Sequence, residues 1–285
     1  MKLWITGSKG MLGQDLCALA KQRFEVFESD KEIDITDDFT VSMFIAQNKP
    51  DTIINCAAYT AVDNAETEPE FNYELNTKGP KILGEWAAKT GIGVIHVSTD
   101  YVLNGTAPNP LREDAPIDPI NAYGKAKAEG EALLASVNPN HWIVRTAWLY
   151  GFHGKNFVKA MLNLMRTREQ ISVVSDQLGN PTWTRDLAEA LLKIAEKPKM
   201  PGVYNCTGEG ITSWHEFAKE IQKQALEKKL LEREIPILPI SSSEWKSAAK
   251  RPIWSALDKT KIKENFNVNV PAWQDSLSKY MELEK

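Results

Sequence analysis

The fold is decided by residues 2–13, which read Lys-Leu-Trp-Ile-Thr-Gly-Ser-Lys-Gly-Met-Leu-Gly. The apolar run at 2–6 predicts a buried strand, and the apolar spacing over 11–22 predicts an amphipathic helix. Gly7, Gly10 and Gly13 stand between them in the spacing G-x-x-G-x-x-G. Glycines at such a turn let the backbone approach a pyrophosphate, and the N-terminus of the next helix attracts its negative charge. Residues 7–13 therefore predict a dinucleotide-binding turn.

The alternation of strand and helix continues through the first half of the chain. Further strands are predicted at 24–27, 51–55, 94–98 and 142–145, and further helices at 39–47, 70–89 and 123–135. Strands joined in this way by helices form a parallel sheet that is covered on both faces. We therefore expect an α/β protein with a doubly wound Rossmann-type parallel sheet, which binds NAD(P) and spans residues 1–147.

The pattern loosens in the second half of the chain. Helices are predicted at 157–165, 185–196, 214–226 and 273–283, with short strands at 171–174 and 203–205. We expect residues 148–285 to form mainly a smaller C-terminal α/β lobe that binds the substrate over the strand ends, with some segments returning to the first domain. The four prolines of residues 106–119 predict a mobile loop over the site.

Composition excludes several classes of protein. The 285 residues include 34 Lys+Arg and 38 Asp+Glu, and a net charge of −4 excludes a strongly basic protein that binds nucleic acid. No stretch approaches the ~20 apolar residues that cross a bilayer, so no membrane partner is expected. The three cysteines are far apart and fit a reducing compartment, without a disulfide framework or zinc site. We expect a cytoplasmic protein.

The end of the second predicted strand carries candidate cofactor residues. Asp30 follows Gly10 by 20 residues, where an acidic side chain can bind the ribose hydroxyls of the adenosine. The adjacent Lys31 favours a 2′-phosphate instead, so the choice between NADH and NADPH stays open. Asp34 and Ile35 would flank the adenine, although Asp34 is equally well explained as a solvated loop carboxylate.

A second group of residues suits proton transfer. Tyr123 and Lys127 lie four residues apart on a predicted helix, so their side chains share one face. A nearby cation favours the phenolate and brings the pKa of the tyrosine closer to the working pH. Thr99 and Asp100 follow the fourth predicted strand, where ligand-contacting residues of such sheets lie. The hydroxyl of Thr99 could bond the same substrate oxygen that Tyr123 protonates.

At this point the chain resembles the extended short-chain dehydrogenase/reductase superfamily, and within it the dTDP-4-dehydrorhamnose reductase family. The matching segments are the glycine turn, residues 55–63 (Asn-Cys-Ala-Ala-Tyr-Thr-Ala-Val-Asp) with Ala65-Glu66, Asn76, residues 98–102 (Ser-Thr-Asp-Tyr-Val), residues 123–127 (Tyr-Gly-Lys-Ala-Lys), residues 145–151 (Arg-Thr-Ala-Trp-Leu-Tyr-Gly), residues 176–182 (Asp-Gln-Leu-Gly-Asn-Pro-Thr), and Arg251-Pro252 with Ser255. The resemblance implies NADPH- or NADH-dependent reduction of the C4 ketone of dTDP-4-dehydro-L-rhamnose, a step in dTDP-rhamnose biosynthesis.

The resemblance also implies roles for single residues. Tyr123 would donate a proton to the forming alkoxide, Lys127 would bind the nicotinamide ribose and lower the pKa of Tyr123, and Thr99 would polarise the carbonyl group. Asp100 and Trp148 would contact the sugar. Apart from the resemblance, the net charge of −4 means that a local cation must attract the anionic sugar nucleotide, and Arg251 is the candidate. The cofactor-binding set is Gly7, Gly10, Met11, Leu12, Gly13, Asp30, Asp34, Ile35, Ala57, Ala58, Tyr59, Asn76, Tyr123 and Lys127.

Several alternatives stay open. Another reductase or an epimerase of the superfamily would share the same turn, and so would a non-catalytic, nucleotide-binding regulatory subunit. A 4,6-dehydratase would carry a glutamate after Asp100, where Tyr101 stands. Some relatives are dimers bridged by Mg²⁺; Asp15 is suitably placed, but Trp183-Thr184-Arg185 offers no glutamate, so we predict no metal. The oligomeric state stays open, with a homodimer as one alternative.

Overall fold

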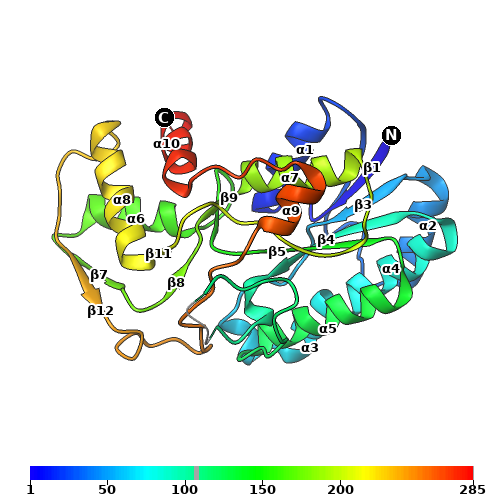
Figure 1. Cartoon of the computed structure of the whole chain (residues 1–285), viewed down its shortest axis with the longest axis horizontal. Helices are drawn as coiled ribbons and strands as arrows, with labels where there is room; N and C mark the ends of the chain where they lie inside the picture. The colour runs from blue at the N-terminus through cyan, green and yellow to red at the C-terminus, as the bar shows by residue number, and fades with distance from the viewer. Residues whose placement is uncertain (106–108, 285) are drawn as a thin grey trace.

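The N-terminal half of the molecule is built on one parallel sheet. The computed structural model describes residues 1–105 and 109–284. Within them the sheet has six strands in the order β10-β5-β4-β3-β1-β2. Figure 1 labels its strands β1, β3, β4 and β5. The bounds of the six strands are β1 (Lys2–Thr6), β2 (Glu25–Ser29), β3 (Thr52–Asn55), β4 (Gly93–Thr99), β5 (His141–Thr146) and β10 (Gly202–Asn205). All neighbouring pairs run parallel, so their carboxyl ends meet at one edge of the sheet.

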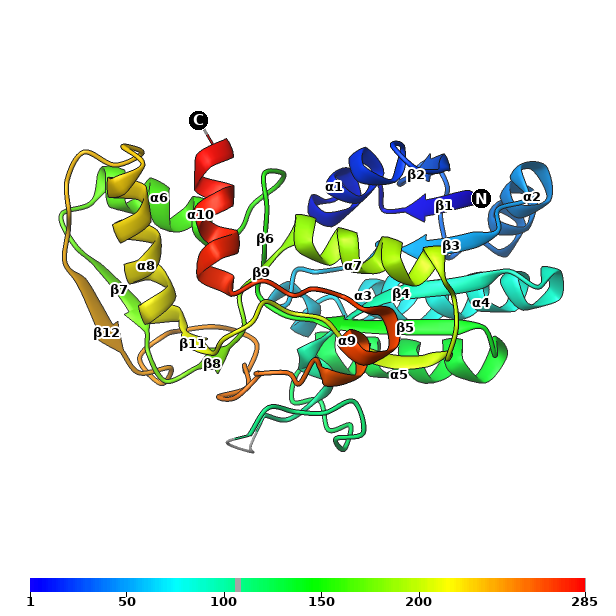
Figure 2. The ribbon, with the colours of Figure 1, turned by 45° about the horizontal axis from the view of Figure 1, so that its top comes forward.

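Helices cover both faces of this sheet, as the sequence predicts (Figure 2). One face buries α1 (Met11–Ala20), α7 (Thr184–Glu196) and α9 (Thr260–Phe266) in a single apolar cluster. The other face buries apolar residues of α2 (Asp38–Asn48), α4 (Gly79–Thr90) and α5 (Ala122–Val137). The doubly wound Rossmann-type architecture is therefore confirmed. Both α7 and β10 come from the second half of the chain, and they pack on or extend this sheet.

The predicted helix over 70–89 differs from the structure. It consists of α3 (Pro69–Tyr73), a π-helical turn (Glu74–Lys78) and α4. This turn packs closely on α5: a Cβ on Gly130 would lie 2.1 Å from the carbonyl oxygen of Asn76. Thr77 Oγ1 also donates to the carbonyl oxygen of Ala126 at 2.8 Å. The wider π-helical turn accommodates this contact with α5. Because the contacting residues are some 50 positions apart in the sequence, local periodicity could not predict the turn.

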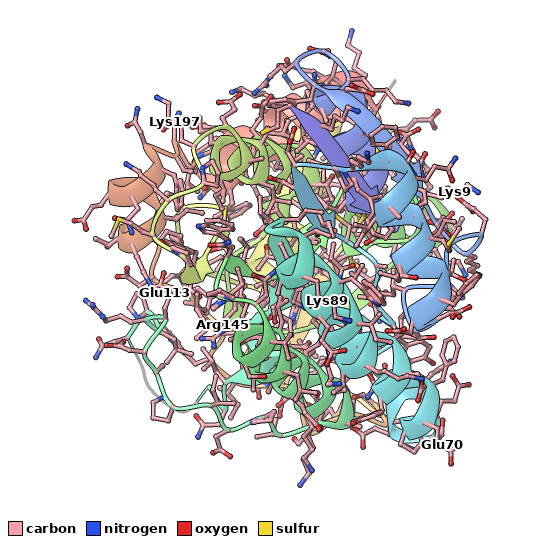
Figure 3. The ribbon with its side chains drawn as sticks, turned by 90° about the vertical axis from the view of Figure 1, so that its right-hand side faces the viewer. Lys9, Glu70, Lys89, Glu113, Arg145 and Lys197 are labelled. Carbon is pink, nitrogen blue, oxygen red and sulfur yellow. The ribbon has the colours of Figure 1, made fainter. Side chains whose placement is uncertain are left out.

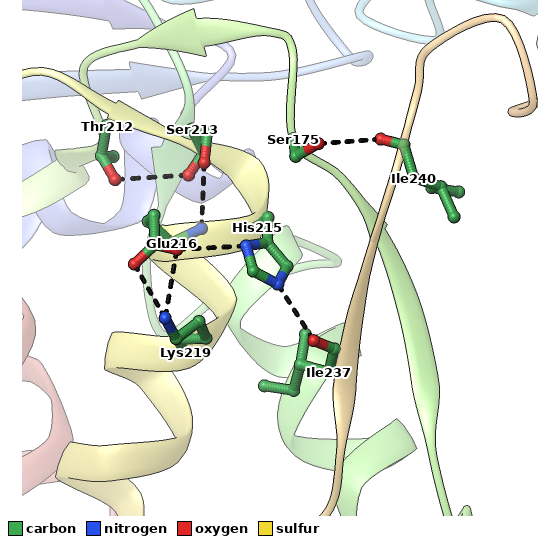
Figure 4. Close-up of polar contacts among 8 residues, drawn as sticks. All are labelled: Ser175, Thr212, Ser213, His215, Glu216, Lys219, Ile237 and Ile240. Carbon is green, nitrogen blue, oxygen red and sulfur yellow. Dashed lines mark hydrogen bonds and ion pairs between the residues drawn. The ribbon is translucent and has the colours of Figure 1, made fainter.

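The C-terminal lobe is smaller and packs around aromatic side chains. Its helices are α6 (Phe157–Thr167), α8 (Trp214–Glu227) and α10 (Trp273–Leu283). Its two-stranded pairs are β6 (Leu149–Tyr150) with β9 (Thr182–Trp183), β8 (Leu178–Gly179) with β11 (Thr212–Ser213), and β7 (Ile171–Val174) with β12 (Ile237–Ile240). Ser213 caps α8 by accepting from the N–H of Glu216, and His215 links α8 to the carbonyl oxygen of Ile237 on β12 (Figure 4). Tyr150, Phe217 and Tyr280 form its buried aromatic centre.

The loop predicted at 106–119 begins at residues 106–108, which lie outside the described residues. The part from 109 onward is tied to the rest of the molecule: the N–H of Leu111 donates to Ala256 at 2.8 Å, and that of Asp118 to Val102 at 3.1 Å. Arg145 donates to the carbonyl oxygen of Glu113, and both side chains are marked in Figure 3. Of these bonds, the one from Arg145 connects the loop to β5 of the sheet. Among the described helices, none has both the length and the apolar character needed to cross a membrane.

Candidate active site

The glycine turn is closely packed between β1 and α1. Gly7 has a φ of +64°, and a Cβ at this position would lie 2.6 Å from the amide nitrogen of Ala57. A Cβ on Gly13 would lie 2.1 Å from the carbonyl oxygen of Gly7. Both positions therefore exclude larger residues on steric grounds. The turn opens at the carboxyl edge of the sheet, so its shape fits the pyrophosphate cradle that the spacing predicts.

A cavity of about 640 Å³ extends from this turn along the end of β2. It is lined by the predicted residues Gly7, Gly10, Asp30, Asp34, Ile35, Ala57 and Ala58, together with Lys9, Lys31 and Phe71. Asp30 accepts hydrogen bonds from the N–H groups of Lys9 and Lys31, at 3.0 and 2.9 Å. Lys9 forms an ion pair with Glu32 at 3.0 Å. Carboxylates and amines thus both line this end of the cavity.

Asn76 and Tyr59, two of the predicted cofactor residues, do not line this cavity. The Asn76 side chain is fully buried; its Oδ1 accepts from the N–H of Tyr59, and its Nδ2 donates to the carbonyl oxygen of Tyr59 and to Asn72. The Tyr59 hydroxyl donates to Glu68, and its ring stands edge-on to Phe71. Asn76 therefore holds the loop after β3 in place, and both of its polar atoms are used inside the protein.

A second cavity, of about 370 Å³, brings the catalytic candidates together. Thr99, Asp100, Tyr123, Lys127 and Trp148 line it, and so do Gly10, Met11, Leu12 and Gly13 of the glycine turn. Thr99 and Asp100 come from the end of β4, whereas Tyr123 and Lys127 come from one face of α5. Asn121 starts α5 by accepting from the N–H of Gly124 at 2.7 Å. Residues that are far apart in the sequence, from β4 and α5, thus lie together beside the glycine turn.

The electrostatics of the cavity keep Tyr123 protonated. Burial raises the pKa of Tyr123 and the Asp100 carboxylate raises it further, whereas a hydrogen bond with Thr99 lowers it. The resemblance implied that Lys127 lowers this pKa. In the structure Lys127 instead contacts the carbonyl oxygen of Val97 at 2.7 Å and His96 Nε2 at 3.0 Å. The phenol is therefore a proton donor in this state, and Lys127 does not offset the effect of burial.

Three buried polar atoms of this cavity have no hydrogen-bond partner among the described residues. They are Ser98 Oγ, Asp100 Oδ2 and Thr146 Oγ1, and all three residues line the cavity. Burial raises the pKa of Asp100 to about 7, and its Oδ1 accepts from Thr99 Oγ1 at 2.9 Å. Buried polar atoms are paired almost everywhere in folded proteins. Three such atoms in one cavity indicate a site for a ligand with hydroxyl or carbonyl groups.

Trp148 lies where the two lobes meet. Its φ is +48°, and its indole stacks on that of Trp214 at the start of α8, with ring centroids 3.5 Å apart. Arg251 lies elsewhere: it pairs with Asp63 at 2.7 Å and lines a third cavity of about 860 Å³. It also contacts Tyr101, which lines the catalytic cavity. The structure thus places Arg251 beside the catalytic cavity and outside it.

Thr146 and Trp214 are among the residues of the cavity that the sequence did not single out as site residues. Thr146 ends β5 as Thr99 ends β4, so the strand-end argument applied to Thr99 would have found it. Trp214 carries no comparable signal, because it is one of nine tryptophans and reaches the site through the packing of the C-terminal lobe.

Comparisons with known proteins agree with this geometry. A dTDP-4-dehydrorhamnose reductase of Aggregatibacter actinomycetemcomitans is 42% identical over 284 residues, with 97% of both chains covered. The crystal structure of a dTDP-4-dehydrorhamnose reductase from Clostridium acetobutylicum has a TM-score of 0.94 and 39% identity, and one from Bacillus anthracis, in complex with NADP, has 0.94 and 35%; each comparison covers 99% of both chains. The family model described as "RmlD substrate binding domain" matches residues 1–285, and the chain belongs to this family.

Proposed function

We propose that this protein reduces the C4 ketone of dTDP-4-dehydro-L-rhamnose to dTDP-L-rhamnose with NADPH or NADH. The observation that carries the proposal is the cavity that joins Thr99, Tyr123 and Lys127 to the glycine turn. The full-length similarity to reductases of this name supports the substrate. A cytoplasmic location belongs to the proposal, and the free thiols of Cys17, Cys56 and Cys206 support it.

The glycine turn and the cavity along β2 would hold the cofactor, with Gly7–Gly13 at the phosphates and Asp30, Asp34 and Ile35 at the adenosine. Ala57, Ala58 and Tyr59 would line its middle, with Asn76 acting through the backbone of Tyr59. When bound, a reduced nicotinamide supplies the hydride for C4. The division into a cofactor domain at 1–147 and a mainly substrate-binding lobe at 148–285 is part of the same proposal.

The chain's own residues supply the proton and orient the sugar. Tyr123 holds its proton because burial raises its pKa, and it can release that proton to an oxygen that becomes an alkoxide. Thr99 bonds the same oxygen, and Asp100 Oδ2 is left to bind a sugar hydroxyl. Trp148 and Trp214 form an apolar wall of the cavity. Arg251 and the cavity of about 860 Å³ would receive the nucleotide diphosphate.

The test is cofactor oxidation by the purified protein with dTDP-4-dehydro-L-rhamnose. Tyr123→Phe should lower kcat by ~10²–10⁴-fold with little change in KM, because it removes one hydroxyl that acts in proton transfer. Tyr73→Phe is the control, since Tyr73 is 43% exposed and lies outside the cavity.

Equal rates for Tyr123→Phe and the wild type would contradict the catalytic assignment. No oxidation with either cofactor would favour a regulatory subunit that binds nucleotides. Faster turnover of another dTDP- or UDP-linked 4-keto sugar would reassign the substrate and keep the reaction class. A nicotinamide that stays tightly bound through purification and is not consumed would favour an epimerase.

A further inference from the structure

A chain of buried side chains runs beneath the catalytic cavity and ends at Lys127. Thr6 Oγ1 donates to Asn55 Oδ1 at 2.6 Å, Asn55 Nδ2 lies 3.0 Å from His96 Nδ1, and His96 Nε2 lies 3.0 Å from Lys127 Nζ. Thr6, Asn55 and His96 belong to β1, β3 and β4, and Lys127 is on α5. Each of the four side chains is at most 1% exposed. Water therefore cannot substitute for a missing partner in this chain.

The orientation of the Asn55 amide is fixed by the backbone. The N–H of Ala57 can only donate, and it lies 3.0 Å from Asn55 Oδ1. Turning the amide over would place its NH₂ group against this N–H and leave two donors facing each other. Asn55 Nδ2 is therefore the atom that faces His96, and it donates to His96 Nδ1.

The amide in turn fixes the state of the imidazole. Burial lowers the pKa of His96 well below its ordinary value, so the ring is neutral. A neutral imidazole carries one proton, and Nδ1 is already an acceptor. The proton is therefore on Nε2, the atom that points at Lys127. An ammonium group has no lone pair and cannot accept this proton, whereas a free amine can.

We infer that His96 holds Lys127 as a free amine in the cofactor-free protein, with His96 Nε2–H donating to the Lys127 lone pair. The Lys127 N–H groups then donate to the carbonyl oxygen of Val97, which lies 2.7 Å from Nζ. When the cofactor binds beside the turn, its negative phosphates favour the ammonium form. Lys127 then takes one proton from solvent and turns from His96 toward the cavity that it lines.

The surrounding charges agree with this state. Glu131, one turn along α5, is already paired with Arg145 of β5 at 2.7 Å. Burial raises the pKa of the Cys56 thiol to about 12, so it is neutral, as is the buried phenol of Tyr123. Asp100 lies at the Thr99 end of the cavity and bonds to Thr99. None of these groups offers Lys127 an unpaired negative charge, and burial lowers the pKa of Lys127 to about 8, so the free amine prevails above that pH.

His96 is thus a positioning residue, which acts on the reaction through Lys127. The inference deepens the proposed function. Only the part on the protonation of Lys127 when the cofactor binds rests on that function. The state of the imidazole can be measured in the cofactor-free protein without any substrate, so the two can fail separately.

The deciding experiment is nitrogen NMR of the full chain labelled with ¹⁵N-histidine and freed of cofactor. The chain has four histidines, and a His141→Gln, His153→Gln, His215→Gln variant leaves His96 alone. Should the triple variant not fold, the three single variants each remove one other signal and identify His96 by elimination. We expect a neutral ring protonated on Nε2 between pH 9 and 10, above the Lys127 pKa of about 8. A proton on Nδ1 in this range would make Lys127 the donor, and an imidazolium would leave Nδ1 without a lone pair for Asn55; either result would overturn the inference.

Cofactor affinity as a function of pH is the second readout. Binding that takes up one proton weakens about tenfold for each pH unit above the pKa of the free protein's amine. We expect this slope for NADPH in the wild type between pH 8 and 10. His96→Gln should move its onset upward by at least one pH unit, because a glutamine oxygen can accept from the ammonium group. His141→Gln, on the neighbouring strand, should leave the slope unchanged. An unmoved onset in a folded His96→Gln protein would contradict the role of His96.

Discussion

At the scale of single residues, the protein buries the carboxyl group of Asp100 in surroundings that disfavour its charged form. Asp100 is 4% exposed, and burial raises its pKa to about 7. A raised carboxyl pKa means that the native state binds more protons than the unfolded chain between about pH 4 and 7. The free energy of unfolding contributed by Asp100 therefore falls as pH rises through this window. The cavity gains an acceptor for substrate at a cost in stability.

Asp100→Asn should remove this pH dependence. Between pH 5 and pH 8, the unfolding free energy of the variant should rise relative to wild type by at most roughly 3 kcal/mol, since each pKa unit corresponds to about 1.4 kcal/mol. Urea unfolding at both pH values measures the difference. Asp114→Asn is the control, because this side chain is 79% exposed. A constant difference between Asp100→Asn and wild type at the two pH values would show that Asp100 is ionised throughout.

Residue types and spacing predicted Thr99, Tyr123 and Lys127 because each lies at a strand end or on a helix face that the pattern defines. The cavity brings these three together. His96 could not be predicted in the same way. It sits in the middle of β4 and reads as a buried strand residue, and its partners Asn55 and Lys127 become neighbours only when the sheet and α5 are assembled.

At the scale of elements, the turn between β1 and α1 depends on Gly13 more than on Gly10. A Cβ on Gly13 would lie 2.1 Å from the carbonyl oxygen of Gly7, whereas one on Gly10 would lie 3.1 Å from the same atom. The first distance requires the backbone to move, and the second requires a shift of a few tenths of an ångström. The spacing of glycines predicted the turn because such steric demands are local.

Gly13→Ala should therefore lower stability by about 3 kcal/mol and abolish measurable NADPH binding, because overpacking displaces the turn. Replacing a helical glycine by alanine ordinarily raises stability by up to about 1 kcal/mol. A loss of stability in Gly13→Ala would therefore identify the steric contact with Gly7. Gly10→Ala is the matched variant, and it should lower both stability and NADPH affinity less than Gly13→Ala does. Thermal unfolding and titration of NADPH fluorescence would check them. Equal effects at the two positions would contradict the steric account.

At the scale of the whole molecule, the two lobes meet through Trp148 and Trp214. Trp148 follows β5 of the first lobe, and Trp214 begins α8 of the second. A φ of +48° is costly for a tryptophan, by roughly 1–3 kcal/mol, so the surroundings must hold Trp148 in place. The stack on Trp214 does so, as does Gly179, where a Cβ would lie 2.6 Å from the Trp148 ring. Local periodicity predicted helices and strands on both sides of this contact but carries no information on the contact itself.

Trp214→Ala should consequently impair the sugar site and spare the cofactor site. Aromatic pairs contribute up to about 1.5 kcal/mol beyond their buried area, so we expect kcat/KM for the sugar nucleotide to fall at least about tenfold. The dissociation constant of NADPH should change less than twofold, because the cavity along β2 does not include Trp214. Trp214→Phe keeps a stacking ring and should recover most of the activity. Parallel losses in NADPH and sugar binding would mean that Trp214 holds the two lobes together generally, and that the stack does not specifically orient Trp148.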